Sequence, residues 1–487
     1  MKPLFRNITG NRWVLGISIL FILVNAVFIA NGWYLLLILP FAVLIAYLAV
    51  FSINRLIFLT VFLVPLSVPL ENYVTDIGFN IQVPTEINLF VILLLIIFKV
   101  VAEQPFKKSI LLHPVSIAIY VNLGWLIITA CASSMPFVSF KFVIARLWFL
   151  VTFYFLASHL FLSYRNIRLY LWLYILAFLA VIGTALVYMW GNGIFSQQAA
   201  HISARPFLPD HTSYGAILAM LLPFLIGFGF YPKYRTSQKM LTWFLVIVFL
   251  VAVILSYTRA AWLSLGVALC CYLLIRFRVK FYILLLVSTC VLAVVYVNRT
   301  DIIMKLEQNH QDSSKDLTKH LQSIYNIQSD VSNLERINRW KCALRMFEER
   351  PVFGWGPGAY MFQYAPFQMW RDKTEISTNM GDWGNAHSEY IGPLAESGLL
   401  GTLTLVILII TVFYTALKRY SSLNKERSTK ILLLCATLGL ITYCTHGFLN
   451  NFLDTDKASA LFWGYIAIIV AIDVRYRKRE SEPTLQS

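Results

Sequence analysis

The sequence predicts an all-α, polytopic membrane protein, and three observations lead to this fold class. Of the 487 residues, 59% are hydrophobic and only 13% are charged, whereas soluble domains are about 45–50% apolar and about 25% charged. The apolar residues form runs of roughly 20, the length that a helix needs to cross a bilayer. These runs are uninterrupted, which favours helices over the alternating strands of a membrane barrel.

Fourteen apolar segments are candidate membrane spans. They begin near Trp13, Trp33, Ile57, Ile87, Pro114, Phe142, Leu169, Tyr214, Leu241, Ala260, Phe281, Glu389, Ile431 and Ala460. No small-residue cleavage site follows the first run, so we interpret it as a retained helix and not as a signal peptide. We therefore expect about 12–14 transmembrane helices and one large periplasmic loop containing short helices.

Lysine and arginine predict the orientation, because short cytoplasmic loops collect both residues. With the N-terminus inside, one face receives Lys2, Arg6, the Lys418–Lys430 loop and the Arg475–Arg479 tail. The long segment on the other face carries eleven basic and eleven acidic residues, so the net charge of +16 belongs to the cytoplasmic face. This charge therefore needs no nucleic acid to explain it. Contact with anionic membrane lipids is a second use of such a face.

The spans divide the chain into four parts. These are N-terminal transmembrane helices over 1–297, the large periplasmic loop over 298–388, C-terminal transmembrane helices over 389–474 and a cytoplasmic tail over 475–487. In the second half of the loop, Ser332 and Glu335 have capping-box spacing, and Pro351 would stop a helix. They predict a helix from about Asn333 to Glu349.

One face of this predicted helix is apolar, with Ile337, Trp340, Leu344 and Phe347. We expect it to lie on the membrane surface or on the helix bundle. On a helical wheel of this segment, Arg336 lies closer to the apolar stripe than Arg339 and Arg345 do. Arg336 should therefore reach the bundle, while the other two should face water. Simple snorkelling of Arg336 at an interface is the alternative.

The stretch "FGWGPGAY" follows, with glycines at 354, 356 and 358. No strand precedes these glycines, so the spacing does not fit a dinucleotide site. We interpret it as a tight turn that brings backbone close to the bundle. A phosphate cradle is the alternative.

Several polar residues border the spans of the outer face. Arg259, in "LSYTRAAW", occupies a very short connection between two spans. An arginine at that depth is costly unless paired and is a functional hypothesis by default. A headgroup anchor is the alternative. Arg205, Asp210 and His211 precede the span near Tyr214, and structural roles remain open for them and for Arg146.

His387 stands at the outer mouth of the twelfth span, and the unperturbed pKa of histidine suits proton transfer near neutral pH. The topology gives it a depth similar to that of Arg205, Arg259 and Arg336. Such cations hold phosphate groups, and a histidine beside them can activate a hydroxyl. A polar anchor is the alternative for His387. Glu396, nine positions further on, should lie roughly 13 Å deeper and pair with an arginine or with backbone.

Three stretches in a fixed order around the large loop carry a resemblance: "SYTRAAWLSLG", "ERINRWKCALRMFEERPVFGWGPGAY" and "NAHSEYIGPLAESGLLG". Between about Pro206 and Gly401 the chain resembles the O-antigen ligase and O-antigen polymerase family of bacterial envelope enzymes. The resemblance implies a multi-pass protein of the bacterial inner membrane, with its active site facing the periplasm. Ligases of this family move glycan from undecaprenyl diphosphate to lipid A core sugar in lipopolysaccharide biosynthesis. Polymerases move it to another lipid-linked repeat.

Three residues match residues of the family. Arg259 matches the arginine that begins a loop-proximal helix, Arg336 the arginine four positions before a tryptophan, and His387 the histidine that opens a late span. Ser388 and His211 stand where the family often has asparagine, so these two positions carry no site prediction.

The resemblance implies an inverting, metal-independent glycosyltransferase that needs no cofactor. Arg259 and Arg336, with Arg205 as a further substrate-binding residue, would hold the diphosphate, and His387 would take the proton of the acceptor hydroxyl. The acceptor would be lipid A core or another glycan.

Two other functions remain open on the sequence. One is an O-antigen or exopolysaccharide polymerase of the same family. The other is a transporter of lipid-linked glycans, but transporters usually have matched broken helices and ionisable residues near the midplane. The first half of the sequence shows no such cluster.

Overall fold

The computed structural model describes residues 8–33, 35–72, 81–102, 106–277, 331–374, 377, 384–423 and 426–481. The chain forms two compact units, residues 1–59 and 60–487. The helices are α1 (Ile8–Ala30), α2 (Leu39–Phe51), α3 (Ile53–Leu63), α4 (Thr85–Ala102), α5 (Lys108–Leu111), α6 (Pro114–Cys131), α7 (Pro136–Phe149), α8 (Ala157–Leu160), α9 (Tyr164–Asn192), α10 (Gln197–Ile202), α11 (His211–Gly229), α12 (Thr236–Leu255), α13 (Arg259–Arg276), α17 (Val331–Glu349), α18 (Tyr360–Gln363), α19 (Ile391–Ser422), α20 (Arg427–His446) and α21 (Asp456–Ser481).

Short elements complete the described fold. They are 3-10 turns at Leu35–Ile38, Val64–Leu66, Leu70–Asn72, Ala365–Phe367 and Trp370–Asp372, a π-helical segment at Leu150–Leu156 between α7 and α8, and strands β1 (Val68–Pro69) and β2 (Gln82–Val83). The two strands pair antiparallel, with Val68 opposite Val83.

The fold confirms the predicted all-α membrane class. Among the residues described, nine helices are long and apolar enough to cross a membrane, and three apolar helices are shorter. Each predicted span within these residues coincides with a helix. The span predicted near Phe281 lies outside them, as does the boundary at residue 297, so the division into four parts stays a prediction.

In the second unit, α21 is the central helix, and its most apolar window is completely buried. Tyrosine hydroxyls attach its neighbours: Tyr170 of α9 donates to the carbonyl of Ala460 at 2.7 Å, and Tyr465 of α21 donates to the carbonyl of Met220 in α11 at 3.0 Å. A hydroxyl buried in the bundle needs such a partner. These bonds fix α9 and α11 around α21.

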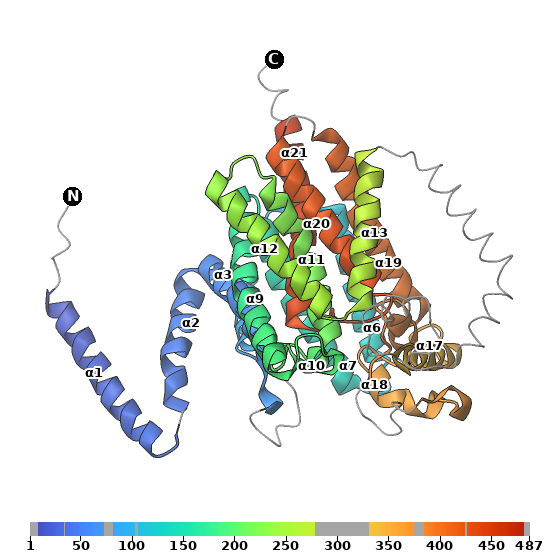
Figure 1. The fold of residues 1–487 in the computed structure, drawn as a ribbon, viewed down its shortest axis with the longest axis horizontal. Coiled ribbons are helices and arrows are strands. Elements are labelled where there is room, and N and C mark those ends of the chain that lie inside the picture. The colour runs from blue at the N-terminus through green and yellow to red at the C-terminus, as the bar shows by residue number, and fades with distance from the viewer. Residues whose placement is uncertain are drawn as a thin grey trace. The chain divides into compact units, whose positions relative to one another are not determined.

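The two ends of this unit differ in composition (Figure 1). The C-terminal end of α21, with Arg475–Arg479, lies at one end, together with the basic connections α11–α12 and α19–α20. Helices α10, α17 and α18 gather at the opposite end. The predicted inner and outer elements are thus separated, although which end faces the periplasm stays a prediction.

Candidate functional site

The first element of the candidate site is the start of α11. Asp210 is its N-cap, and its Oδ1 accepts from Ser213 N and from Thr212 Oγ1, both at 2.7 Å. Burial acts to raise the pKa of Asp210, but these hydrogen bonds and His211 lower it overall. Asp210 is therefore an anion at neutral pH. The ring of His211 stacks on His201 of α10, with centroids 4.0 Å apart.

The connection between α12 and α13 packs against this start. Thr258 Oγ1 donates to the carbonyl of His211 at 2.7 Å. The contact is close because Gly215 has no side chain: a Cβ there would lie 2.7 Å from Thr258. Arg259 is the next residue and the first of α13. The predicted short connection is confirmed, and it holds Arg259 beside α11.

Helix α17 begins at Val331, two residues before the prediction, and ends at Glu349 as predicted. Ser332 lies inside the helix, so it is not an N-cap. The predicted capping box is therefore wrong, and Glu335 makes other contacts. The helix packs on α19 at the end of the bundle (Figure 1).

The predicted faces of α17 are wrong for Arg339, Arg345 and Leu344. Arg339 was expected to face water, but only 3% of it is exposed, whereas Leu344 of the supposed contact stripe is 44% exposed. The buried side of the helix consists of Glu335, Asn338, Arg339, Cys342, Ala343 and Met346. Arg345 is also partly covered and pairs with Asp372. The reason is that residues 360–374 and Ser377 cover this polar side, which a helical wheel of the segment could not anticipate.

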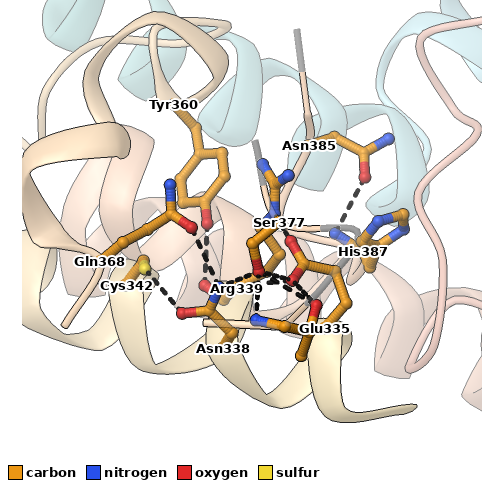
Figure 2. Close-up of polar contacts among 10 residues, drawn as sticks. Glu335, Asn338, Arg339, Cys342, Tyr360, Gln368, Ser377, Asn385 and His387 are labelled. Atoms are coloured by element: carbon orange, nitrogen blue, oxygen red, sulfur yellow. Dashed lines mark hydrogen bonds and ion pairs between the residues drawn. The ribbon is translucent and has the colours of Figure 1, made fainter. Parts of the chain in front are cut away.

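A buried polar network holds this cover on α17 (Figure 2). Arg339 Nε donates to Glu335 Oε1 at 2.6 Å, and its guanidinium lies over the ring of Tyr364, 4.1 Å from the centroid. Ser377 and Thr374 also donate to Glu335. Burial acts to raise the pKa of Glu335, but these bonds and that of Arg339 lower it. The network therefore contains an ion pair and not a neutral pair.

The glycine turn after α17 brings backbone close to the bundle, as predicted, and it packs against α19. Gly354, Gly356 and Gly358 all have positive φ. A Cβ on Gly356 would lie 1.9 Å from a serine hydroxyl of the α6–α7 connection, so only glycine fits there. The amides of Trp355 and Gly356 donate to carbonyls of α19 at 2.9 and 2.8 Å. These amides are engaged in the protein, which argues against the alternative of a phosphate cradle.

The same turn meets a break in α19. Gly398 interrupts the helix with φ 69°, and the amide of Leu399 donates to the carbonyl of Pro351 at 3.0 Å. Glu396 Oε1 accepts from the amide of Tyr360 at 3.2 Å. The expectation that Glu396 pairs with backbone is therefore confirmed.

In the sequence, His387 lies between the glycine turn and the start of α19. Its φ is 49°, and its amide donates to Asn385 Oδ1 at 3.0 Å. Among the residues described, only His387 and Tyr257 are non-glycine residues with positive φ, and Tyr257 is two positions before Arg259. Such backbone is uncommon outside glycine and often marks functional sites. Burial, and then the charges of Arg336 and Arg339, lower the pKa of His387 to about 4.

Arg336 joins these elements. Its Nε donates to the carbonyl of Leu449, in the α20–α21 connection, at 3.2 Å, and its Nη1 donates to Asn333 at 2.9 Å. Burial lowers its pKa, and Asp210 opposes that shift. The charges of Arg336 and Arg259 act on one another. The prediction that Arg336 reaches the bundle is confirmed.

Arg336 is the common neighbour of the predicted site residues, because its charge acts on both Arg259 and His387, and Asp210 acts on Arg336 and His387. Arg205 differs, because it is exposed and its Nε donates to the carbonyl of Pro209 in its own loop, at 3.1 Å. Its role in substrate binding stays a prediction.

Glu389 anchors the α20–α21 connection to the start of α19. Its Oε1 accepts from the hydroxyl of Tyr443 and from the amides of Phe452 and Leu453, at 2.6, 2.7 and 2.9 Å. Burial, and then Asp454, raise the pKa of Glu389 to about 7. Arg146 pairs with Asp454 at 2.9 Å. Arg146 and Glu389 therefore have structural partners.

A cavity of about 50 Å³ lies beside this anchor and is lined by Asn122, Phe142, Arg146, Glu389, Glu396 and Trp463 among others. This volume suits one or a few water molecules. We do not assign a substrate to it.

Comparison with known proteins finds a family match over the part of the chain that contains these residues. Residues 244–406 match the model of a family described as O-antigen ligase. This match confirms the predicted resemblance to the O-antigen ligase family. The family segment contains Arg259, Arg336 and His387, and it ends inside α19. An uncharacterized protein of Haemophilus influenzae is 22% identical over 267 residues, which cover 53% of this chain and 64% of the relative.

Some neighbours of the site were not predicted from the sequence. Asp210 had been left without a role, yet its charge acts on both Arg336 and His387. His446, at the end of α20, is acted on by Arg336, Asp210 and His211. Both lie outside the O-antigen ligase family segment. A polar residue at the outer end of a span was the available signal, but that signal is common at membrane borders.

Proposed function

We propose that this protein is a glycosyltransferase of the bacterial inner membrane. It would move a glycan from an undecaprenyl diphosphate carrier to an acceptor hydroxyl on the periplasmic face, as an O-antigen ligase does. The observation that carries this proposal is the grouping of Arg259, Arg336 and His387 at one end of the helix bundle. The match of residues 244–406 to the O-antigen ligase family supports it.

In the proposed reaction, the acceptor oxygen attacks the anomeric carbon of the donor sugar. The bond from that carbon to the diphosphate oxygen breaks, and its electron pair stays on the diphosphate. Arg336 and Arg259 would bind the diphosphate and stabilise the charge that grows on it. The acceptor proton passes to His387. A single displacement of this kind inverts the anomeric centre.

The environment of His387 suits a base that is unprotonated before the donor binds. With its pKa lowered to about 4, the imidazole is neutral at pH 7 and can accept a proton. A bound diphosphate would bring negative charge beside Arg336 and raise the pKa of His387 again. The base would then be strongest in the complex with the donor, where proton transfer occurs.

The test uses purified protein in lipid nanodiscs with a lipid-linked glycan as donor. His387→Ala should retain donor binding and lose turnover by about 10²- to 10⁴-fold. Arg336→Ala and Arg259→Ala should lose donor binding. Lys341→Ala is the matched control, because Lys341 is an exposed cation of α17. Added chelator should leave turnover unchanged, since arginines and a histidine supply the charge and the base.

Two acceptors distinguish the members of the family. Lipid A core sugar should be glycosylated if the protein is a ligase, and a second lipid-linked repeat if it is a polymerase.

Turnover retained by His387→Ala would show that His387 is not the base.

A further inference from the structure

The connection between α20 and α21 carries buried polar atoms without partners. His446 is 1% exposed, and neither Nδ1 nor Nε2 has a hydrogen-bond partner among the residues described. Asn450 Nδ2 and Asn451 Oδ1 are likewise buried without a hydrogen-bond partner among these residues. Native proteins satisfy most buried polar atoms, so each exception calls for an explanation. Here the exceptions lie within six consecutive residues.

These residues adjoin the candidate site. Arg336 donates to the carbonyl of Leu449, and the amides of Leu449 and Asn450 donate to the carbonyl of His446. His446 is therefore linked through one short turn to the arginine proposed to bind diphosphate. Asp210 and His211 also act on His446 electrostatically.

Two more unpartnered atoms come from α17 and α11. Trp340 lies one helical turn after Arg336 on α17, and its Nε1 is buried without a partner, as is Nδ1 of His211 at the start of α11. Unsatisfied atoms thus come from three elements, and the charge of Arg336 acts on both histidines among them, His211 and His446. A ligand that makes several hydrogen bonds would satisfy them together.

The kinds of atoms indicate the ligand. A neutral imidazole offers one donor and one acceptor, the indole and the Asn450 amide nitrogen are donors, and the Asn451 oxygen is an acceptor. A diphosphate presents acceptors and would satisfy only the donors. Sugar hydroxyls donate and accept, so they fit the mixed set. The guanidiniums fit the diphosphate beside them.

We propose that His446, with Asn450 and Trp340, binds hydroxyl groups of the sugar that is attached to the carrier diphosphate. The inference rests on the proposed function and adds a site for the donor sugar to it. His446 is a binding residue in this scheme. It would favour one donor glycan over another while His387 performs the proton transfer.

The test compares two ligands and two variants in nanodiscs. His446→Phe keeps a ring and removes both nitrogens, whereas His446→Gln keeps one donor and one acceptor. We expect His446→Phe to weaken binding of the glycan-linked carrier about tenfold, the effect of one or two lost hydrogen bonds. Binding of bare undecaprenyl diphosphate should not change. His446→Gln should restore part of the affinity.

Thr437→Val is the matched control, because Thr437 is buried on the same helix and its hydroxyl bonds to the carbonyl of Leu433. It should bind both ligands as the wild type does. Equal affinities of wild type and His446→Phe for the glycan-linked carrier would overturn the proposal, since water would then satisfy the ring. An equal loss for both ligands would make His446 a structural or diphosphate residue.

Turnover separates this inference from the function on which it rests. His446→Phe should raise the KM for the donor and leave kcat and the KM for the acceptor nearly unchanged. A rise in the acceptor KM alone would place the acceptor sugar there and refute the donor assignment. If the wild type binds the glycan through His446 but transfers nothing, the proposed function fails and the sugar site stands. If it binds neither ligand, both fail.

Discussion

Arg339→Ala should loosen the cover on α17. Arg339 and Glu335 are 3% and 5% exposed, and their 2.6 Å bond is an ion pair. Removing the arginine leaves a buried carboxylate with only neutral donors such as Ser377 and Thr374. Removing one partner of a buried pair costs about 3–5 kcal/mol. We expect the free energy of opening residues 360–374 and Ser377 away from α17 to fall by this amount.

Native-state proteolysis measures this opening. When reclosing is fast, the cleavage rate follows the population of the open form. Each 1.36 kcal/mol is a factor of ten, so cleavage within residues 331–377 should rise by at least about 100-fold. Lys341→Ala is the control on the same helix: Lys341 is 48% exposed in its pair with Asp372. An exposed cation of this kind is worth about 0–1 kcal/mol, and Arg345 would still pair with Asp372, so cleavage should rise no more than about fivefold.

A double variant tests the cause. Glu335→Gln with Arg339→Met removes both charges and keeps similar volumes, so most of the protection should return. Cleavage of Arg339→Ala at the wild-type rate would refute the buried ion pair. Rapid cleavage of the double variant would show that the packing of Arg339 on Tyr364 matters more than its charge.

Three further predictions concern chemistry, backbone and topology. Burial and neighbouring arginines lower the pKa of His387 to about 4, so kcat/KM, which reports the free enzyme, should stay high as pH falls through 6.5 and decline only near 4. The value of kcat, which reports the complex with donor, should decline at a higher pH. A decline of kcat/KM at pH 6.5 would contradict this. Gly398→Ala should reduce accumulation or turnover, because φ is 69° and a Cβ would lie 2.1 Å from a backbone carbonyl oxygen; Gly266→Ala, with nothing within 4 Å, should be neutral. Ser314→Cys, outside the described residues, should react with external reagent in intact cells; labelling only after permeabilisation would reverse the orientation.

The spans and the glycine turn could be predicted because each follows from local composition. A run of apolar residues has one stable state in a bilayer, and glycines at 354, 356 and 358 permit backbone that other residues avoid. Both signals are contained in a short window of sequence. They therefore do not depend on which distant segment packs nearby.

The orientation of α17 could not be predicted in the same way. Its wheel showed an apolar stripe and a polar side, and the usual rule buries the stripe. The structure covers the polar side, because Tyr360, Tyr364 and Ser377 supply partners for Arg339 and Glu335. No local pattern announces that a segment 20 to 40 residues later will return over the helix.

The neighbourhood of His387 was predictable only where a motif marked it. Arg259 stood out because an arginine at the depth of a membrane span is rare, and Arg336 because it lies near the apolar stripe of its helix. Asp210 resembled an ordinary helix cap, which it also is. His446 sits at a span end like many polar residues, and only burial without partners distinguishes it.

Arg336 and the carbonyl that it binds at Leu449 are 113 residues apart. A chain emerges from the ribosome with its N-terminal part first, so α17 is synthesised before α20 and α21. Until those helices insert, Arg336 lacks its carbonyl and Glu389 lacks the amides of Phe452 and Leu453. A nascent or truncated chain ending after α19 would carry the whole segment that matches the O-antigen ligase family and still lack these contacts. If the proposed function holds, Arg336 would therefore be positioned to bind diphosphate only after the last two helices are in the membrane.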